Sequence, residues 1–446
     1  MSRALVPGSA LVVGLGQSGV AVAAMLSERG TNVAVTDDDG AKLDAYTGTA
    51  AALDRDTATA RLGDFDTVVV SPGVACTDPL LVAAAGAGLQ VISEFALAAR
   101  FVEVPLIAIT GTNGKSTTVS LLARMLEEAG RTALAAGNIG RPLSSVAGLE
   151  ADHIVAEVSS FQLEWPGDLS PDVVCLLNIG SDHLDRHRDL ATYRRTKLDL
   201  FRGPRPPRLA VIAETAGDDI VSAAEASGAE LWRFGRTGAA GASAVLADID
   251  KRRLCPSRGA PIELSGPWPR AAHDLDNAAA AAAIALALGV SQQAVAQGCE
   301  RFEPLEHRLA LVARAGGLSF WDDSKATNPD AALASVEAFE GPVVLLVGGD
   351  DKGADLSPLA TAAARIKGAV AFGAARERLE AVLGGGSNFY RVETLENAFE
   401  RAVEMAEAGD SVLLAPACSS LDQFVDYAER GRRFAELAAK WAESEV

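Results

Sequence analysis

A short glycine-rich segment has the residue types that chemistry on a triphosphate needs. It reads G-T-N-G-K-S-T, it follows an apolar run at 106–110, and a helical pattern with one apolar face continues from 115 to 129. Small residues let backbone N–H groups approach phosphate oxygens, and the N-terminus of the following helix adds partial positive charge. The lysine would reach the terminal phosphates, and a hydroxyl beside it would contact Mg²⁺. The residues of this predicted ATP site are Gly111, Thr112, Asn113, Gly114, Lys115, Ser116 and Thr117.

Two further polar segments follow the predicted strands at 153–158 and 173–178. Ligands bind at the carboxyl ends of parallel strands, so we expect Glu157 and His183 to face the phosphate loop together. A carboxylate and a neutral imidazole suit a divalent cation, although Mg²⁺ prefers oxygen and His183 would be an unusual ligand. For either residue alone, a surface group or a helix cap is the alternative.

The N-terminal segment contains the pattern G-x-G-x-x-G at 14–19, between a predicted strand at 10–13 and a helix at 19–29. Asp37 stands at the end of the next predicted strand, so the dinucleotide fingerprint has its usual β-α-β context. Taken alone, the pattern favours an NAD-dependent oxidoreductase. A nicotinamide enzyme does not need a triphosphate loop, however, and the same loop can hold the diphosphate of UDP.

The phosphate loop departs from the common pattern G-x-x-x-x-G-K-[ST], because position 109 is isoleucine. Its compact form resembles the signature of the Mur ligases and folylpolyglutamate synthases, and the segments around Glu157 and His183 resemble the Mur ligases in particular. The resemblance implies that Glu157 and His183, with the Ser116 hydroxyl, bind magnesium, and that Lys197 carries a carbamate. Without the resemblance, Lys197 is a solvated lysine on a charged helix.

In Mur ligases of this type the first domain holds a UDP-sugar. The resemblance places Asp37 at the uracil or ribose and the 14–19 loop against the diphosphate. The residues it implies for the UDP-substrate are Gly14, Leu15, Gly16, Gln17, Ser18, Asp37, Ser71, Gly73, Asn138, Ser159 and Gln162.

Three polar loops follow predicted strands in the last third of the chain, at 322–328, 348–353 and 415–424. Together they suggest one rim of a site, although each loop alone can be an ordinary turn built from polar residues. The set resembles the glutamate-adding Mur ligases, with Arg308, Asp323 and Asn277 serving ATP and Lys325 near the transferred phosphoryl group. The residues implied for glutamate are Thr327, Lys352, Ser420, Leu421 and Tyr427. Two departures are Tyr427, where phenylalanine is frequent, and Asp274, where asparagine is frequent.

The resemblance implies ATP-dependent ligation of D-glutamate to UDP-N-acetylmuramoyl-L-alanine through an acyl phosphate, with Mg²⁺, in bacterial peptidoglycan precursor synthesis. The residues implied for catalysis are Lys115, His183, Lys197 and Lys325. The same carboxylate-binding groups could hold either enantiomer of glutamate. The alternatives are another ligase of the superfamily, such as a folate-tailing enzyme, a nicotinamide oxidoreductase, and a nucleotide-triphosphate switch that binds a partner.

The 446 residues predict an α/β protein of three domains, each a mostly parallel sheet with helices. We expect a Rossmann-like UDP-substrate domain at 1–102, a P-loop domain that binds ATP at 103–306, and a Rossmann-like domain at 307–446 that contacts the amino acid and ATP.

The formal net charge of −19 argues against nucleic-acid binding, since no broad cationic face is available. No apolar run reaches the 18 to 20 residues of a membrane span, so membrane insertion is not expected. The five cysteines are scattered and none is spaced C-x-x-C, which favours a reducing cytoplasm over a disulfide framework. We expect a monomer.

Overall fold

The computed structural model describes residues 6–236, 244–266, 268–385 and 388–445. Their strands form three sheets of five, nine and six strands. By contacts the described residues fall into two compact units. The first unit contains the described parts of Met1–Asn178, Ala191–Gly266 and Leu275–Phe302, and the second those of Ile179–Leu190, Pro267–Asp274 and Glu303–Val446. The expected α/β class is confirmed, while the boundaries near 102 and 306 stay a prediction.

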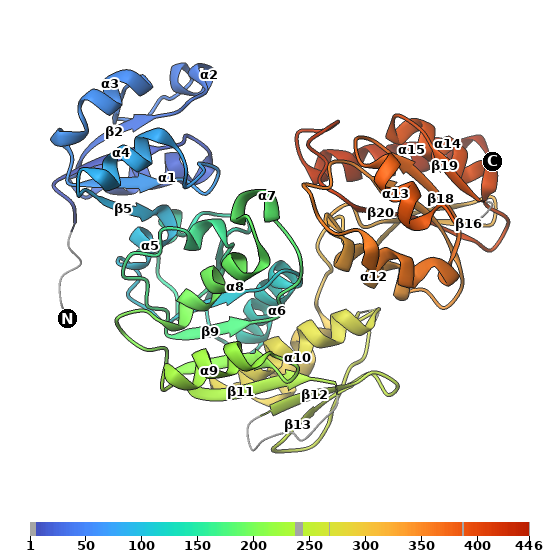
Figure 1. Ribbon diagram of the computed structural model, residues 1–446. Helices are drawn as coiled ribbons and strands as arrows, with labels where there is room; N and C mark the ends of the chain where they lie inside the picture. The colour runs from blue at the N-terminus through green and yellow to red at the C-terminus, as the bar shows by residue number, and fades with distance from the viewer. Residues whose placement is uncertain (1–5, 237–243, 267, 386–387, 446) are drawn as a thin grey trace. The chain divides into compact units, whose positions relative to one another are not determined.

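The N-terminal sheet has the strand order β3-β2-β1-β4-β5, and all of its pairings are parallel. The predicted strands at 10–13, 32–36 and 67–70 are confirmed, and the first helix starts two residues earlier than predicted. Figure 1 shows this sheet and its helices in blue. The elements are β1 (Ser9–Val13), α1 (Gln17–Glu28), β2 (Asn32–Thr36), α2 (Gly40–Asp44), β3 (Ala51–Ala52), α3 (Arg55–Ala60), β4 (Thr67–Val70), α4 (Pro79–Gly86), β5 (Gln90–Ser93) and α5 (Glu94–Ala99).

The middle sheet has the order β14-β13-β12-β11-β10-β9-β6-β8-β7. Its central strand β6 is buried throughout, as its unbroken apolar run predicts. The strands and helices of this part are β6 (Leu106–Thr110), α6 (Lys115–Glu128), β7 (Ala133–Gly137), β8 (His153–Glu157), β9 (Val173–Leu176), α7 (Leu184–His187), α8 (Leu190–Leu198), β10 (Leu209–Ala213), α9 (Asp218–Ala226), β11 (Glu230–Gly235), β12 (Ala244–Asp248), β13 (Arg253–Pro256), β14 (Ile262–Glu263), α10 (Ala272–Ala287) and α11 (Gln292–Glu300). The antiparallel extension β12-β13-β14 was not predicted.

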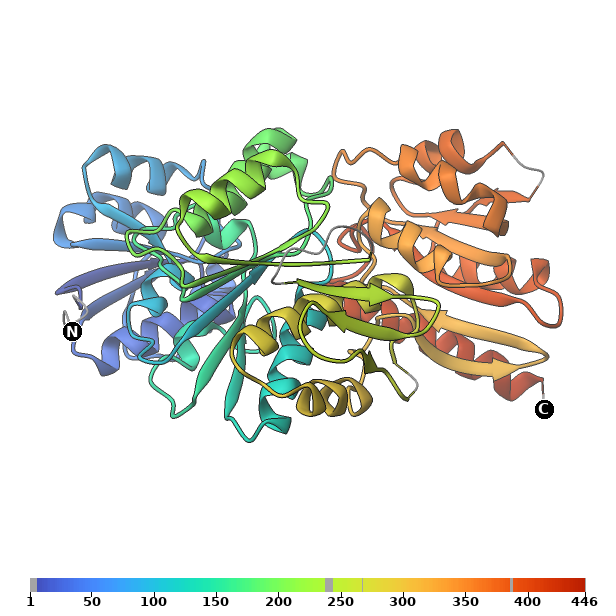
Figure 2. The same cartoon turned by 90° about the horizontal axis from the view of Figure 1, so that it is seen from below.

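The C-terminal sheet has the order β15-β16-β20-β17-β18-β19, and only the edge strand β15 pairs antiparallel. Helices α12 and α13 pack on one face and α14 and α15 on the other, drawn in orange to red in Figures 1 and 2. The elements are β15 (Ala310–Ala315), β16 (Leu318–Asp322), α12 (Pro329–Glu337), β17 (Val343–Gly348), β18 (Ile366–Phe372), α13 (Arg376–Leu383), β19 (Phe389–Arg391), α14 (Leu395–Met405), β20 (Ser411–Ala417) and α15 (Tyr427–Ser444).

This topology fixes where the polar loops lie. Strands β8, β6 and β9 are neighbours, and so are β16, β20 and β17, so the loops that follow each set meet at one edge of their sheet. Within the described residues, no helix combines the length and the apolar character that a membrane span requires.

Candidate active site

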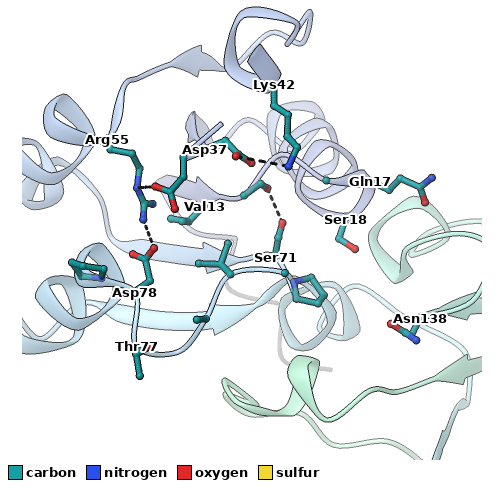
Figure 3. Close-up of a pocket in the computed structure, with 18 residues that line it drawn as sticks. Val13, Gln17, Ser18, Asp37, Lys42, Arg55, Ser71, Thr77, Asp78 and Asn138 are labelled. Atoms are coloured by element: carbon teal, nitrogen blue, oxygen red, sulfur yellow. Dashed lines mark hydrogen bonds and ion pairs between the residues drawn. The ribbon is translucent and has the colours of Figure 1, made fainter. Parts of the chain in front are cut away.

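A cavity of about 700 Å³ opens at the carboxyl edge of the N-terminal sheet. The loops after β1, β2 and β4 line it, and Asn138, which follows β7 of the middle sheet, completes the wall (Figure 3). Eight of the residues predicted for the UDP-substrate line this cavity: Gly14, Gly16, Gln17, Ser18, Asp37, Ser71, Gly73 and Asn138. Leu15, Ser159 and Gln162 are not among the lining residues, and the last two hydrogen-bond to each other at 3.0 Å.

The glycines of the first loop have different tasks. A Cβ on Gly19 would lie 1.8 Å from the carbonyl oxygen of Gly14, so the fold itself requires glycine at 19. A Cβ on Gly16 would meet no atom within 4 Å, because this residue faces the cavity. Asp37 holds the loop by accepting a hydrogen bond from the Leu15 N–H at 2.5 Å. Glycine at 19 and the Asp37 hydrogen bond thus fix the shape of the loop, and the space beside Gly16 is open.

Charged residues that the sequence analysis did not identify also line the cavity. Arg55, at the start of α3, contacts Asp38 at 2.7 Å and also pairs with the buried Asp78 (Figure 3). Lys42 lies 4.0 Å from Asp37 and is about half exposed. The one sequence signal for Lys42 is that, like Asp37, it follows the end of a strand.

The phosphate loop adopts left-handed backbone conformations that favour glycine. Gly114, the residue before α6, has φ 86°, and a Cβ there would lie 2.1 Å from Oδ1 of Asn277. Helix α10 therefore packs its Asn277 amide directly against the loop. Lys115 folds back so that its Nζ donates to the carbonyls of Gly111 at 2.9 Å and Thr112 at 2.8 Å. The Lys115 ammonium thus lies over the loop. A phosphate bound there would compete with the two carbonyls for its hydrogen bonds.

Glu157, at the end of β8, has a buried carboxylate of which one oxygen accepts no hydrogen bond from the described residues. Its Oε1 accepts a hydrogen bond from Asn138 Nδ2 at 2.9 Å, whereas its Oε2 finds no hydrogen-bond donor in the described structure. A buried carboxylate oxygen without a donor fits a divalent cation. Across the residues that the structure describes, no group of three or more His, Cys, Asp or Glu side chains could hold a metal. Protein carboxylates and imidazoles alone would therefore leave the cation incompletely coordinated.

His183 belongs to the second compact unit, so its expected pairing with Glu157 stays a prediction. Its backbone has φ 53°, and its N–H donates to the Asp182 carboxylate at 2.9 Å. The other oxygen of Asp182 lies 3.6 Å from His183 Nε2 and accepts a hydrogen bond of 3.4 Å from Asn328. Asp182 thus joins the His183 segment to the loop at the end of β16.

Lys197 is buried, with only 1% of its surface exposed. Its Nζ donates to the Gly111 carbonyl at 2.9 Å and to the Thr110 hydroxyl at 3.3 Å, and it lies 4.6 Å from the centre of the Tyr193 ring. The structure therefore excludes the solvated lysine that the residue pattern alone suggests. Its ammonium meets the first residue of the phosphate loop.

Three loops of the C-terminal sheet meet, as the topology requires. Asp350 and Ser419 exchange two backbone hydrogen bonds of 3.0 and 2.8 Å, which join the loop of Lys352 to the loop of Ser420. The Ala417 N–H donates to the Ala326 carbonyl at 2.9 Å and joins the loop of Lys325 and Thr327 to the same point. The residues predicted for glutamate on these loops thus share one edge of the sheet, with Ser420 buried and Leu421 64% exposed.

Arg430 of α15 holds the three loops together from beneath. Its side chain is fully buried, and it donates to Ser324 Oγ at 3.0 Å, Ser324 O at 2.9 Å, Cys418 O at 3.1 Å and Gly348 O at 3.3 Å. Burial lowers the pKa of this guanidinium to about 10. The sequence analysis missed Arg430, because nothing in the pattern of α15 distinguishes it from the other arginines of that helix.

Asp323 and Lys325 stand on either side of Ser324. Burial raises the pKa of the Asp323 carboxyl, while a hydrogen bond from Ser335 and the charge of Arg308 oppose that rise. Lys325 Nζ lies 2.7 Å from the Tyr427 hydroxyl. The expected ATP residues Asp323 and Arg308 are therefore neighbours within the second unit.

Comparison with known proteins agrees with this layout. Three family descriptions match: the MurD-like N-terminal domain of Mur ligases at 8–93, the Mur ligase middle domain at 109–285, and the glutamate ligase domain of Mur ligases at 307–418. A UDP-N-acetylmuramoylalanine–D-glutamate ligase from Desulfosudis oleivorans is 39% identical over 445 residues, which cover 98% of this chain and 97% of that protein. A ligase of the same name from Pseudomonas putida is 34% identical, and 96% of each chain is covered.

The chain belongs to the Mur ligase family.

Solved Mur ligases share its fold. UDP-N-acetylmuramate-alanine ligase MurC of Thermotoga maritima aligns with a TM-score of 0.62 at 18% identity, covering 98% of this chain and all of that one. MurF ligase of the same organism, solved in complex with ADP, aligns with a TM-score of 0.61 at 19% identity, covering 85% of this chain and 90% of that one. The predicted membership of the Mur ligase family is confirmed, whereas the roles of the individual site residues stay predictions.

Proposed function

We propose that this Mur ligase joins D-glutamate to UDP-N-acetylmuramoyl-L-alanine and converts ATP to ADP and phosphate, in the synthesis of peptidoglycan precursors. The observation that carries the proposal is the hydrogen bond between Asn138 and Glu157. Asn138 lines the cavity of the N-terminal sheet, and Glu157 ends a strand next to the one that leads into the phosphate loop. This contact supports the proposal that a UDP-linked carboxylate binds beside a triphosphate within one compact unit.

The chemistry follows from the reactivity of the substrates. A free carboxylate and an amine do not condense at neutral pH, so a carboxylate oxygen attacks the γ-phosphorus and ADP leaves. The glutamate nitrogen then attacks the carbonyl carbon of the acyl phosphate, loses a proton, and phosphate leaves as the amide forms. Positioning and charge neutralisation are the main contributions of a protein to such steps. We assign charge neutralisation to Lys115 and Lys325, and orientation of the acyl carbonyl to His183.

Magnesium fits the residues of the first unit. The unshared oxygen of Glu157 and the buried hydroxyl of Ser116 would hold it, together with phosphate oxygens and water, which Mg²⁺ commonly retains as ligands. When bound, the cation offsets charge on the ATP phosphates.

We assign a carbamate to Lys197. Support comes from the burial of Lys197 and from the 2.9 Å contact of its Nζ with the Gly111 carbonyl, beside the phosphate loop. The uncharged amine is the species that reacts with CO₂. The amine nitrogen attacks the carbon of CO₂, a C–N bond forms, and one proton leaves the nitrogen. The product offers two oxygens beside the phosphate loop. To test this, Lys197→Ala is assayed with and without short carboxylic acids, and partial recovery of activity is expected. Full activity of the alanine variant without added acid would refute the carbamate.

We place glutamate at the three joined loops of the second unit, with its carboxylates on Thr327, Lys352 and Ser420. Support comes from the Asp350–Ser419 backbone pairing, which holds the last two of these loops together. Leu421 and Tyr427 would contact the remainder of the amino acid.

Phosphate release by the purified protein tests the function. Release should require ATP, UDP-N-acetylmuramoyl-L-alanine and D-glutamate together, and L-glutamate should not replace the D-enantiomer. Turnover of ATP without the two other substrates would indicate a nucleotide switch, and tight NADH binding would revive the oxidoreductase alternative. We also expect a cytoplasmic monomer. Light scattering coupled to size-exclusion chromatography tests the oligomeric state.

A further inference from the structure

Lys325 carries its positive charge beside a neutral partner. Its Nζ lies 2.7 Å from the Tyr427 hydroxyl oxygen and 4.2 Å from the centre of the Tyr427 ring. Within the described residues, no Asp or Glu oxygen lies within 4.0 Å of this Nζ. A carboxylate in that place would neutralise the ammonium. The phenol oxygen instead accepts a hydrogen bond and leaves the full charge available to an anion.

The position of Tyr427 is fixed independently of Lys325. Its carbonyl accepts a hydrogen bond from Ser324 Oγ at 2.8 Å, and the same Oγ also contacts the buried Arg430. Tyr427 is the first residue of α15, and the preceding Asp426 caps that helix by accepting from the Glu429 N–H at 2.7 Å. The hydroxyl is therefore presented from a rigid helix start.

The backbone of Lys325 is fixed as well. Its N–H donates to the His307 carbonyl at 3.2 Å, and its carbonyl accepts from the Thr327 N–H at 2.8 Å. It stands between Asp323, assigned to ATP, and Thr327, assigned to glutamate. The side chain of Lys325 is the remaining variable, and its ammonium donates a hydrogen bond to the Tyr427 hydroxyl.

We propose that Tyr427 is a positioning residue whose hydroxyl aims the Lys325 ammonium at the phosphoryl group during its transfer to the substrate carboxylate. The inference rests on the proposed ligase function. Phenylalanine at 427 retains the ring and its attraction for the cation but lacks the oxygen, so the ammonium regains rotamer freedom.

A double-mutant cycle tests the proposal with Tyr427→Phe, Lys325→Ala and the combined variant. Tyr427→Phe should lower kcat about tenfold, the low end for losing a hydrogen bond to a charged group, and leave the KM for ATP and UDP-substrate within about twofold. In the Lys325→Ala background, the same change should have less than about a twofold effect. Single-turnover measurements with excess enzyme keep the slow lysine variants measurable.

Tyr390→Phe is the matched control. Tyr390 also contacts a cation, because the Arg401 guanidinium lies 3.8 Å from its ring centre, but it sits on β19 away from the three loops. This variant should keep the wild-type kcat.

Two results would overturn the inference: an unchanged kcat in Tyr427→Phe, or an equal loss with and without Lys325. A wild-type protein that releases no phosphate with all three substrates would instead refute the proposed function.

Discussion

Asn138 Nδ2 and Glu157 Oε1 lie 2.9 Å apart, and this side-chain contact joins the cavity of the N-terminal sheet to the edge of the phosphate-loop sheet. Asn138 directly follows β7, and Glu157 is the last residue of the neighbouring parallel strand β8. A Cβ on Gly137 would lie 2.2 Å from the Glu157 carbonyl oxygen, so glycine at 137 permits this close approach. The contact uses one carboxylate oxygen and leaves the other, Oε2, without a hydrogen-bond donor in the described structure.

Replacing Glu157 by glutamine tests whether its second carboxylate oxygen binds a cation. The amide oxygen can still accept from Asn138, but the second position loses its charge and becomes a donor. We expect activity to fall at least about tenfold and the Mg²⁺ concentration for half-maximal activity to rise, with UDP-substrate affinity within a few-fold. Titration of activity with Mg²⁺ measures this. Glu150→Gln, at an exposed carboxylate, should match the wild type. An unchanged magnesium requirement in Glu157→Gln would place the cation elsewhere.

Glycine substitutions separate ligand binding from folding in the first loop. Gly16→Val adds a side chain that meets no protein atom but enters the cavity, so we expect weaker UDP-substrate binding and an unchanged thermal midpoint. Gly19→Ala drives a methyl group into the Gly14 carbonyl, so the midpoint itself should fall. Calorimetric titration and thermal unfolding of both variants measure this, with ATP binding as the internal reference. Normal UDP-substrate affinity in Gly16→Val would show that the diphosphate does not bind at this loop.

Much of this architecture could be predicted from the sequence because its signals are local. The phosphate loop lies between an apolar strand and an amphipathic helix, and the topology then brings the loops after β6, β8 and β9 together. The burial of Lys197 is not local, since only the packing of α8 against the start of the phosphate loop hides it. Arg430 was missed for the same reason. Strands β12, β13 and β14 are too short to show a recognisable hydrophobic periodicity.

A buried carboxyl group predicts a pH dependence of stability. Glu94, at the start of α5, is fully buried, and its Oε1 accepts from the Ser144 N–H at 2.9 Å. Burial raises its pKa in the folded state. The folded protein therefore holds its proton to higher pH than the unfolded chain, so stability falls as pH rises from the unfolded pKa through the folded one. The loss is complete above that window.

Glu94→Gln should remove this loss. We expect the variant to unfold at a higher temperature than the wild type at pH 7.5 and at nearly the same temperature at pH 4, where the wild-type carboxyl is protonated in both states. Thermal unfolding at the two pH values checks this. Glu103→Gln, at an exposed glutamate, should show no such difference between pH values. A glutamine variant less stable than the wild type at pH 7.5 would mean that the ionised carboxylate stabilises the fold.

Arg430 gives the last prediction, because its planar fork serves acceptors on three separate loops. A lysine at 430 offers its donors from a single atom and cannot reach the same set of carbonyls. At least one buried acceptor should then lose its partner, at a cost of about 1–3 kcal/mol, which lowers the thermal midpoint by several degrees in a domain of this size.

The same substitution should affect one substrate selectively. The loops of Lys352 and Ser420 lose a shared anchor, so the KM for D-glutamate should rise at least about tenfold, while UDP-substrate affinity, which belongs to the other unit, stays unchanged. The control is Arg433→Lys, which alters a more exposed arginine of the same helix that pairs with Glu396 at 2.6 Å. It should leave both the midpoint and the KM near the wild-type values. If Arg430→Lys weakened UDP-substrate binding as strongly as glutamate binding, Arg430 would support the whole fold and would not organise the glutamate loops in particular.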